Sequence, residues 1–276
     1  MCGLQSSVPC TGVFLHILNC FLLLLLLKEV LGCPSVCQLC TGKQVNCRNL
    51  GLSSIPKNFP KSTVLVYLSG NNISHVIPNE LTGLQKLAVL YLDNSSISYV
   101  HPKAFVELNK LCYLHLNNNH IKRMDPGIFE GLSDLHCLYL QNNQISFVPR
   151  GLFSGLISLI LSHNDLEHVN SNTFSSLHNL MYLQLDKNKI VSIGDNTFEK
   201  MGSSLKILNL ASNNLTDLQP KGMPSSIGKE MEPVLMGNRT KSGTGSRSLF
   251  ARSQDHSLVQ PLLSHSCRRG TLSLST

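Results

Sequence analysis

The stretch Leu111–Ile121 reads LCYLHLNNNHI, and its spacing of leucine, asparagine and isoleucine decides the fold. The pattern Leu-x-x-Leu-x-Leu-x-x-Asn-x-Ile recurs, with small departures, as TVLVYLSGNNI, LAVLYLDNSSI, LHCLYLQNNQI, LISLILSHNDL, LMYLQLDKNKI and LKILNLASNNL. The asparagine positions follow one another at intervals of 24, 24, 24, 21, 24 and 25 residues. Seven copies in near-constant register predict a solenoid in which each copy forms one coil that stacks on the next.

Each copy predicts a short β-strand followed by a buried asparagine. Side chains alternate between the two faces of a strand, so Leu114 and Leu116 should point inward and stack on their counterparts in adjacent coils. The asparagine after the strand can satisfy backbone N–H and C=O groups of neighbouring coils. We call this column the asparagine ladder: Asn71, Ser95, Asn119, Asn143, Asn164, Asn188 and Asn213. Because Ser95 replaces an asparagine, we expect the ladder to be weaker there.

A second column lies ten residues after each ladder position and is predicted to fill the convex side of the solenoid. We call it the phenylalanine spine: Leu81, Phe105, Phe129, Phe153, Phe174 and Phe198. Both columns occupy positions that a stack of coils needs for its own packing, so we assign them no role in binding.

One coil is three residues short. A full copy reads Phe-x-x-Leu-x-x-Leu-x-x-Leu-x-Leu, whereas the copy that begins at Phe153 lacks one Leu-x-x unit. A coil of 21 residues lies within the range of such repeats, but its return arc must stack between longer neighbours. We therefore expect a local kink or a small void, at a cost on the order of a few kcal/mol.

The net charge of +7 is concentrated at the C-terminal end of the chain. Residues 219–276 contain eight Lys and Arg against three Asp and Glu, so a basic groove for nucleic acid is not expected in the repeats. This segment is rich in Ser and Gly and predicts a disordered tail without a closing cap. The core leucines that the last copy would then expose are Leu205, Leu208, Leu210 and Leu215.

The apolar run Val13–Leu27 predicts export. As an α-helix it would span roughly 22 Å, which is short of the ~30 Å hydrocarbon layer of a membrane. We therefore interpret residues 1–32 as a cleavable signal peptide. A retained anchor and a lipidated Cys33 in the stretch VLGC are the two alternatives.

Four closely spaced cysteines follow the predicted signal peptide: Cys33, Cys37, Cys40 and Cys47. Disulfides are favoured over a zinc site because the chain is expected to enter an oxidising compartment, but the spacing allows three connectivities. Cys112, Cys137 and Cys267 bring the mature chain to an odd number of cysteines. The offset between Cys112 and Cys137 within the repeat should point them to opposite faces, so we do not expect them to pair.

Outward-facing strand positions gather five of the six tyrosines on the concave face. Tyrosine is enriched at binding interfaces and also suits β-strands, and the scarcity of neighbouring charges favours a protein-binding patch. The predicted binding residues are Tyr67, Tyr91, Tyr113, His115, Tyr139 and Tyr182. Sequons that predict N-glycosylation begin at Asn72, Asn94, Asn214 and Asn238.

Catalysis is not indicated by the sequence. The histidines of the repeats, including His115, His136, His163 and His168, have no neighbouring carboxylate, cysteine or serine in a triad or metal-binding pattern. We therefore predict neither an enzyme nor a cofactor or metal site.

The cysteine cap, the 24-residue repeats and the phenylalanine spine resemble those of extracellular leucine-rich repeat proteins such as the small proteoglycans and toll-like receptors. The stretches CQLCTGKQVNCRNLGLSSIPKNFP, GLFSG, LSHNDLEHVNSNTFSSL and SLKILNLASNNLTDL look like the synleurin-like cell-surface members of this class. The resemblance covers about residues 1–220. It implies an α/β fold, a curved leucine-rich repeat solenoid with a parallel sheet on its concave face, built from a disulfide cap (33–61) and seven repeats (62–218).

This resemblance also implies the cap pairing Cys33–Cys40 and Cys37–Cys47. Synleurin-like proteins are single-pass cell-surface proteins with more repeats, a C-terminal cap and one transmembrane helix, so the short coil at Phe153 is interpreted as the junction of an internal deletion.

The resemblance implies a non-catalytic extracellular module that sensitises cells to cytokines and lipopolysaccharide. Its expected partner is a receptor or matrix protein on the concave face, and it would contact a membrane only if the N-terminal segment is retained. The alternatives are a secreted matrix glycoprotein like the small proteoglycans, or a poorly folding aberrant isoform without independent function.

Overall fold

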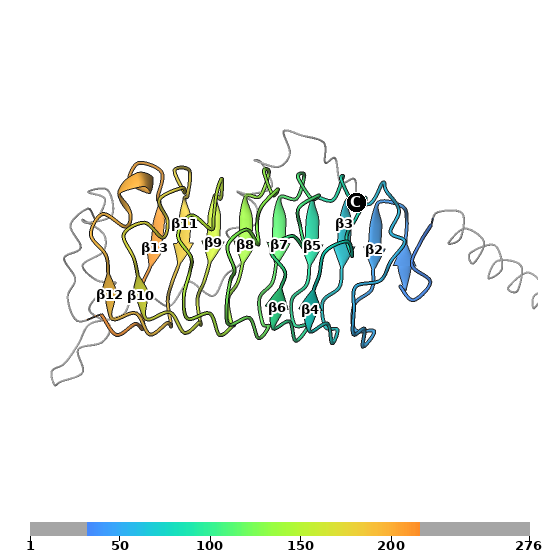
Figure 1. Ribbon diagram of the computed structural model, residues 1–276, viewed down its shortest axis with the longest axis horizontal. Helices are drawn as coiled ribbons and strands as arrows, with labels where there is room; N and C mark the ends of the chain where they lie inside the picture. The colour runs from blue at the N-terminus through green and yellow to red at the C-terminus, as the bar shows by residue number, and fades with distance from the viewer. Residues whose placement is uncertain (1–31, 216–276) are drawn as a thin grey trace, which may run out of the picture.

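The computed structural model describes residues 32–215, and these form one solenoid whose strands lie side by side along its long axis (Figure 1). The main sheet has nine strands in the order β1-β2-β3-β5-β7-β8-β9-β11-β13. Their bounds are β1 Leu39–Cys40, β2 Gln44–Asn46, β3 Leu65–Tyr67, β5 Val89–Tyr91, β7 Tyr113–His115, β8 Cys137–Tyr139, β9 Ser158–Ile160, β11 Tyr182–Gln184 and β13 Ile207–Asn209. From β2 onward the strands are parallel, whereas β1 and β2 form an antiparallel pair.

Two smaller parallel sheets lie on the return side of the coils (Figure 1). One pairs β4 (His75–Val76) with β6 (Tyr99–Val100), and the other pairs β10 (His168–Val169) with β12 (Ser192–Ile193). The remaining arcs of the described residues are turns, apart from the short 3-10 helix η1 (Glu199–Met201). The predicted leucine-rich repeat solenoid is therefore confirmed, with turns rather than α-helices on its convex side.

The core consists of the two columns that the repeat pattern predicts. The inward leucines and the spine phenylalanines are buried in every full coil. In the asparagine ladder, Asn119 Nδ2 donates to the carbonyls of Leu92 and Leu116, and its Oδ1 accepts from two backbone N–H groups of the preceding coil. The other ladder asparagines likewise donate from Nδ2 to one carbonyl of the preceding coil and one of their own. Each Oδ1 accepts from at least one backbone N–H group of the preceding coil.

Ser95 keeps only part of the ladder. Its hydroxyl donates to the carbonyls of Leu68 and Asp93, both at 3.1 Å. A serine is too short to span to the backbone N–H groups that the asparagines bind in the preceding coil. The ladder therefore has fewer hydrogen bonds at this coil, and its lower strength there stays a prediction.

The short coil stacks without the void that its length suggests. Strand β9 keeps full register with β8 and with β11, so the missing residues do not interrupt the sheet. On the convex side, the ring centroid of Phe153 lies 5.9 Å from that of Phe129 and 6.4 Å from that of Phe174. The crevice between Phe129 and Phe153 has no room for a water molecule. The expected void is therefore absent between Phe129 and Phe153, and the alternative, a local kink, stays a prediction.

The last described coil also differs from the expectation. Leu205, Leu208 and Leu210 are buried rather than exposed, and Leu215 is partly buried against the same core. In the described part of the chain, β13 pairs in register with β11, which packs these leucines on the coil before them. The predicted tail 219–276 and Cys267 lie outside the described residues.

The N-terminal cap has the two disulfides that the family resemblance implies, Cys33–Cys40 and Cys37–Cys47. Cys37 and Cys47 are buried in the same core as the repeats, and β2 joins the cap to the main sheet through β3. Both disulfides of residues 32–215 thus lie in the cap, and none joins half-buried Cys112 to buried Cys137.

The predicted signal peptide lies almost entirely outside the described residues. Of residues 1–32, only Gly32 is described. Among residues 32–215, no helix has the length and apolar character needed to cross a membrane. The domain boundaries remain predictions.

Candidate functional site: the concave face

The structure brings Tyr67, Tyr91, His115 and Tyr139 together in one stack across β3, β5, β7 and β8. Their residues are direct partners in the strand register. Neighbouring strands lie about 4.8 Å apart, which is close to the stacking distance of two aromatic rings. Successive ring centroids are 5.0, 4.3 and 4.2 Å apart, with interplanar angles of 14°, 21° and 6°. We call these four residues the aromatic column.

Arg48 extends the aromatic column beyond its first ring. The guanidinium carbon lies 3.8 Å from the centroid of Tyr67 and 5.4 Å from that of Tyr91, which is the range of a cation–π interaction. Within the described residues, Arg48 Nε has no hydrogen-bond partner. The sequence analysis missed this residue because Arg48 belongs to the cap. Arg48 nevertheless lies two residues after β2, just as Ser69 lies two residues after β3. This shared position relative to the strand is the signal that could have identified Arg48.

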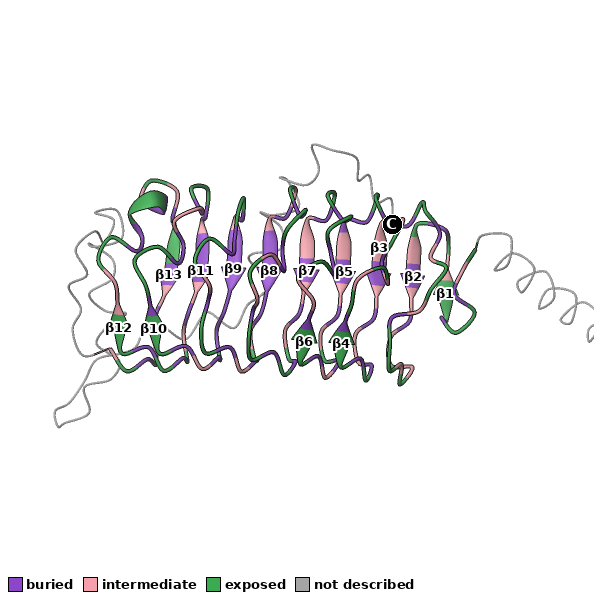
Figure 2. Ribbon diagram, viewed as in Figure 1, coloured by how far each residue is buried: buried purple, intermediate pink, exposed green. Residues whose placement is uncertain are grey.

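Tyr113 and Tyr182 lie on the same face but outside the aromatic column. They belong to the neighbouring outward column, where Cys137 and Ser158 separate them along the register. Strands β8 and β9 are buried along their whole length (Figure 2), and Cys137, Tyr139 and Ile160 form a small apolar cluster of their own. Tyr139 and Tyr182 are themselves buried, so Tyr67, Tyr91, Tyr113 and His115 are the accessible members of the predicted set.

A polar column borders the aromatic column on the C-terminal side of the strands. Ser69 Oγ donates to Asp93 Oδ1 at 2.7 Å, and Ser162 Oγ donates to Asp186 Oδ1 at 2.5 Å. Between these pairs, the side-chain oxygen of Gln141 is buried without a hydrogen-bond partner in the described structure, and that of Asn117 is buried beside His115. The face therefore places hydrogen-bond acceptors beside stacked rings.

Burial between two tyrosine rings keeps His115 neutral. It lowers the pKa of the imidazole to about 4, although the Asp93 carboxylate acts in the opposite direction. Burial also raises the pKa of Tyr91 and of Tyr139, so both phenols keep their protons. At neutral pH the aromatic column is thus an uncharged surface with Arg48 at one end.

The depressed pKa of His115 predicts an acid-sensitive fold. Between the ordinary pKa of 6.5 and the folded value of about 4, the unfolded chain binds a proton that the folded chain does not. Stability is therefore complete above pH ~6.5 and falls as the pH approaches ~4, by up to about 3 kcal/mol. Attraction between an imidazolium and the flanking rings reduces this loss. Urea unfolding across this pH range should show a smaller loss for His115→Phe, and parallel curves for both proteins would contradict the assignment.

The three described sequons all have exposed asparagines. Asn72 and Asn214 follow ladder positions, and Asn94 lies just beyond β5 with a positive φ of 52°. Asn94 Nδ2 donates to Asp93 Oδ2 at 3.0 Å, so a glycan there would border the polar column. Asn238 lies outside the described residues. Glycosylation at these positions remains a prediction.

The histidines outside the aromatic column do not converge. His136 precedes β8, His163 has a positive φ of 55° after β9, and His168 in β10 contacts Ser192 Oγ at 2.8 Å. In residues 32–215, no group of three His, Cys, Asp or Glu side chains is placed to hold a metal ion. The absence of a catalytic arrangement remains a prediction from the sequence.

Comparison with known proteins gives partial matches to curated relatives. Leucine-rich repeat-containing protein 70 from Homo sapiens is 70% identical over 87 residues, which cover 32% of this chain and 14% of that protein. Biglycan from Xenopus laevis is 45% identical over 58 residues, which cover 21% of this chain and 16% of biglycan. Asporin from Bos taurus is 43% identical over 58 residues, covering 21% of this chain and 15% of asporin. The matches therefore span about a sixth or less of the length of these relatives.

A solved structure shares the fold. The crystal structure of the TLR13–ssRNA13 complex superimposes with a TM-score of 0.58 and 27% identity, over 62% of this chain and 24% of that chain. A family model described as leucine rich repeat matches residues 61–121, 110–159, 135–189 and 178–224, which together span more than half of the chain. With its stacked coils, asparagine ladder and disulfide cap, the chain belongs to the leucine-rich repeat family.

Proposed function

We propose that this chain is a non-catalytic extracellular binding module that recognises a protein partner through its concave face. The observation that carries the proposal is the aromatic column, which continues through Arg48 into the cap. Tyr and Arg dominate the binding energy of protein interfaces. Rings that are already stacked lose little side-chain freedom on binding, so they are preorganised for a partner.

The charges of the face favour a protein over a nucleic acid. Among the outward columns of the described strands, Arg48 is the positive side chain, and the carboxylates of Asp93 and Asp186 lie in the polar column. A phosphate backbone requires several Lys or Arg contacts. The RNA named with TLR13 is therefore not carried over to this chain, and we propose a receptor or a matrix protein as the partner.

The resemblance to synleurin-like proteins suggests that the partner belongs to cytokine or lipopolysaccharide responses. A matrix role is the second candidate, and the similarity to biglycan and asporin favours it. Both roles require export, with which the cap disulfides are consistent. The module is proposed to be secreted, and to remain at a membrane only if its N-terminal segment is retained.

The experiment is a binding screen with the full chain purified from mammalian culture medium. The immobilised protein is offered a panel of cytokine-receptor ectodomains, toll-like receptor ectodomains and fibrillar collagens. Tyr91→Ala should weaken a recovered interaction by about tenfold or more, because a central ring is lost. Tyr99→Ala is the matched control, since Tyr99 is an exposed tyrosine on β6, away from the concave face.

Circular dichroism must first show that both variants remain folded. Receptor binding favours the first role and collagen binding the second. The proposal is contradicted if no panel member binds, or if Tyr91→Ala binds as tightly as Tyr99→Ala.

A further inference from the structure

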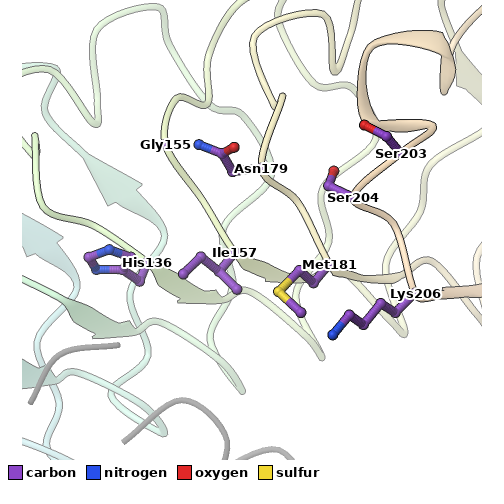
Figure 3. Close-up of a pocket in the computed structure, with 8 residues that line it drawn as sticks. All are labelled: His136, Gly155, Ile157, Asn179, Met181, Ser203, Ser204 and Lys206. Carbon is purple, nitrogen blue, oxygen red and sulfur yellow. The ribbon is translucent and has the colours of Figure 1, made fainter. Parts of the chain in front are cut away.

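A depression that is separate from the aromatic column lies beside the short coil, on the side of the solenoid where the chain enters the strands of the main sheet (Figure 3). We call this side the flank. The depression is open, has a volume of about 420 Å³ and crosses four consecutive coils. His136, Ile157, Met181 and Lys206 lie in one row along it, each directly before a strand of the main sheet. Its volume is in the range of small-molecule sites.

Small residues open this flank where longer ones close it in the earlier coils. The residue three positions before the strand is Gly155 in the short coil, Asn179 in the next coil and Ser204 in the last one. The same position in the earlier coils holds Lys86, Lys110 or Asp134, so Gly155 and Ser204 are smaller than all of these, whereas Asn179 has the size of Asp134. Gly155 has a φ of +69°, and a Cβ there would meet only carbonyl oxygens 3.9 and 4.0 Å away. The wall of the depression is therefore open at the short coil.

The missing residues account for this shape. In a full coil, Leu108 N donates to Phe105 O and Leu111 N donates to Leu108 O, which gives two successive turns before the strand. Residues 153–159 show no counterpart of these two hydrogen bonds in the described structure, because one Leu-x-x unit is absent. The chain instead reaches β9 through Gly155 and leaves Ile157 half-buried in the depression.

The lining combines an apolar floor with groups that attract an anion. Ile157 and Met181 supply the floor, and exposed Lys206 supplies an ammonium group at one end. Lys206 forms no salt bridge among the described residues, and no carboxylate from them lines the depression. Asp134, which occupies the Gly155 position one coil earlier, is paired with Lys110 at 3.0 Å. Ser204 adds a hydroxyl, although its Oγ already donates to Leu180 O at 2.9 Å.

We propose that this depression binds a small amphiphilic anion. The apolar body of the ligand lies on Ile157 and Met181, and its carboxylate, sulfate or sulfonate group pairs with Lys206. A charge-assisted hydrogen bond gives orientation, while the apolar contact supplies most of the binding energy. The ligand is a soluble small molecule and not a membrane surface, because Lys206 is the one Lys or Arg among the described residues of the lining and an anionic membrane is bound through clusters of Lys and Arg. This site is separate from the aromatic column and does not depend on the proposed function.

The probe is 8-anilinonaphthalene-1-sulfonate, which joins an aromatic body to a sulfonate and fluoresces in apolar surroundings. The folded full chain should bind it, and decanoate below its micelle concentration should compete. Lys206→Gln should weaken binding about tenfold, because the charge partner is lost. Lys86→Gln should leave binding unchanged, since Lys86 is an exposed lysine at the Gly155 position of a full coil.

A second variant tests the shape instead of the charge. Inserting Leu-Ser-Asp after Gly155, with the sequence that residues 132–134 have after Gly131 one coil earlier, restores a 24-residue coil with the full Phe-x-x-Leu-x-x-Leu spacing. The insertion should abolish probe binding without lowering the melting temperature. Unchanged binding in both Lys206→Gln and the insertion variant would overturn the proposal. Co-sedimentation with vesicles of phosphatidylcholine and phosphatidylserine, without competition by decanoate, would also overturn it in favour of a membrane surface.

Discussion

Replacing Asn119 with alanine should lower the free energy of unfolding by about 4 kcal/mol or more, which is the largest single-residue effect that we expect. Its amide makes four hydrogen bonds of 2.9–3.0 Å, three to the backbone of the preceding coil and one to its own coil. Asn119 is only 4% exposed, so water cannot replace these bonds. Each backbone group left unsatisfied in the core costs about 1–3 kcal/mol.

Urea unfolding of the secreted protein, followed by circular dichroism, measures this effect. Asn109→Ala is the control, because Asn109 is an exposed asparagine in the turn of the same coil and should change stability by less than about 0.5 kcal/mol. Ser95→Asn is the converse test, and it should stabilise the protein if the amide can reach the preceding coil. A loss below ~1 kcal/mol for Asn119→Ala would mean that the ladder does not hold the coils together.

Removing the Cys37–Cys47 disulfide should lower the free energy of unfolding by about 3–5 kcal/mol. Both residues are buried in the core that continues into the repeats, so the Cys37→Ala, Cys47→Ala variant loses both the cross-link and apolar contact. The Cys33–Cys40 bridge closes a shorter segment and its cysteines are half-exposed, so the matched double variant should lose less. Thermal unfolding of the unchanged protein and the two double variants measures which disulfide contributes more to stability. Equal losses for the two bridges would contradict a cap that is continuous with the core.

The repeat allowed most of the fold to be predicted from the sequence. Positions that recur every 24 residues must have the same environment in each coil, so Phe105 and Asn119 could be placed without coordinates. The short coil could be recognised but its packing could not. Whether three missing residues leave a void depends on how far the arc contracts, and contact between Phe129 and Phe153 decides that.

The concave face could be predicted only in part. Alternation along the strands identified the outward tyrosines, but the stack depends on register and ring orientation. Alternation along a strand shows which way a side chain points but not whether neighbouring residues bury it. Tyr139 and Tyr182 point outward and are nevertheless buried. Arg48 was missed because it lies outside the repeat pattern, and its contact with Tyr67 crosses from the cap into the first coil. The depression beside Gly155 was missed because small residues create it. The repeat pattern is recognised from its large apolar residues, so it does not reveal a depression of this kind.

The central claim is that the short coil belongs to a continuous, folded solenoid that is exported with its concave face intact. Secretion tests it most directly: the full chain is expressed in mammalian cells, and medium and lysate are compared before and after removal of N-glycans. The structure predicts a glycosylated, monodisperse protein in the medium, because the sheet keeps its register through β9 and the core leucines of the last described coil are buried. Protein found only in the lysate, with immature glycans, would contradict this claim and identify the chain as a poorly folding isoform.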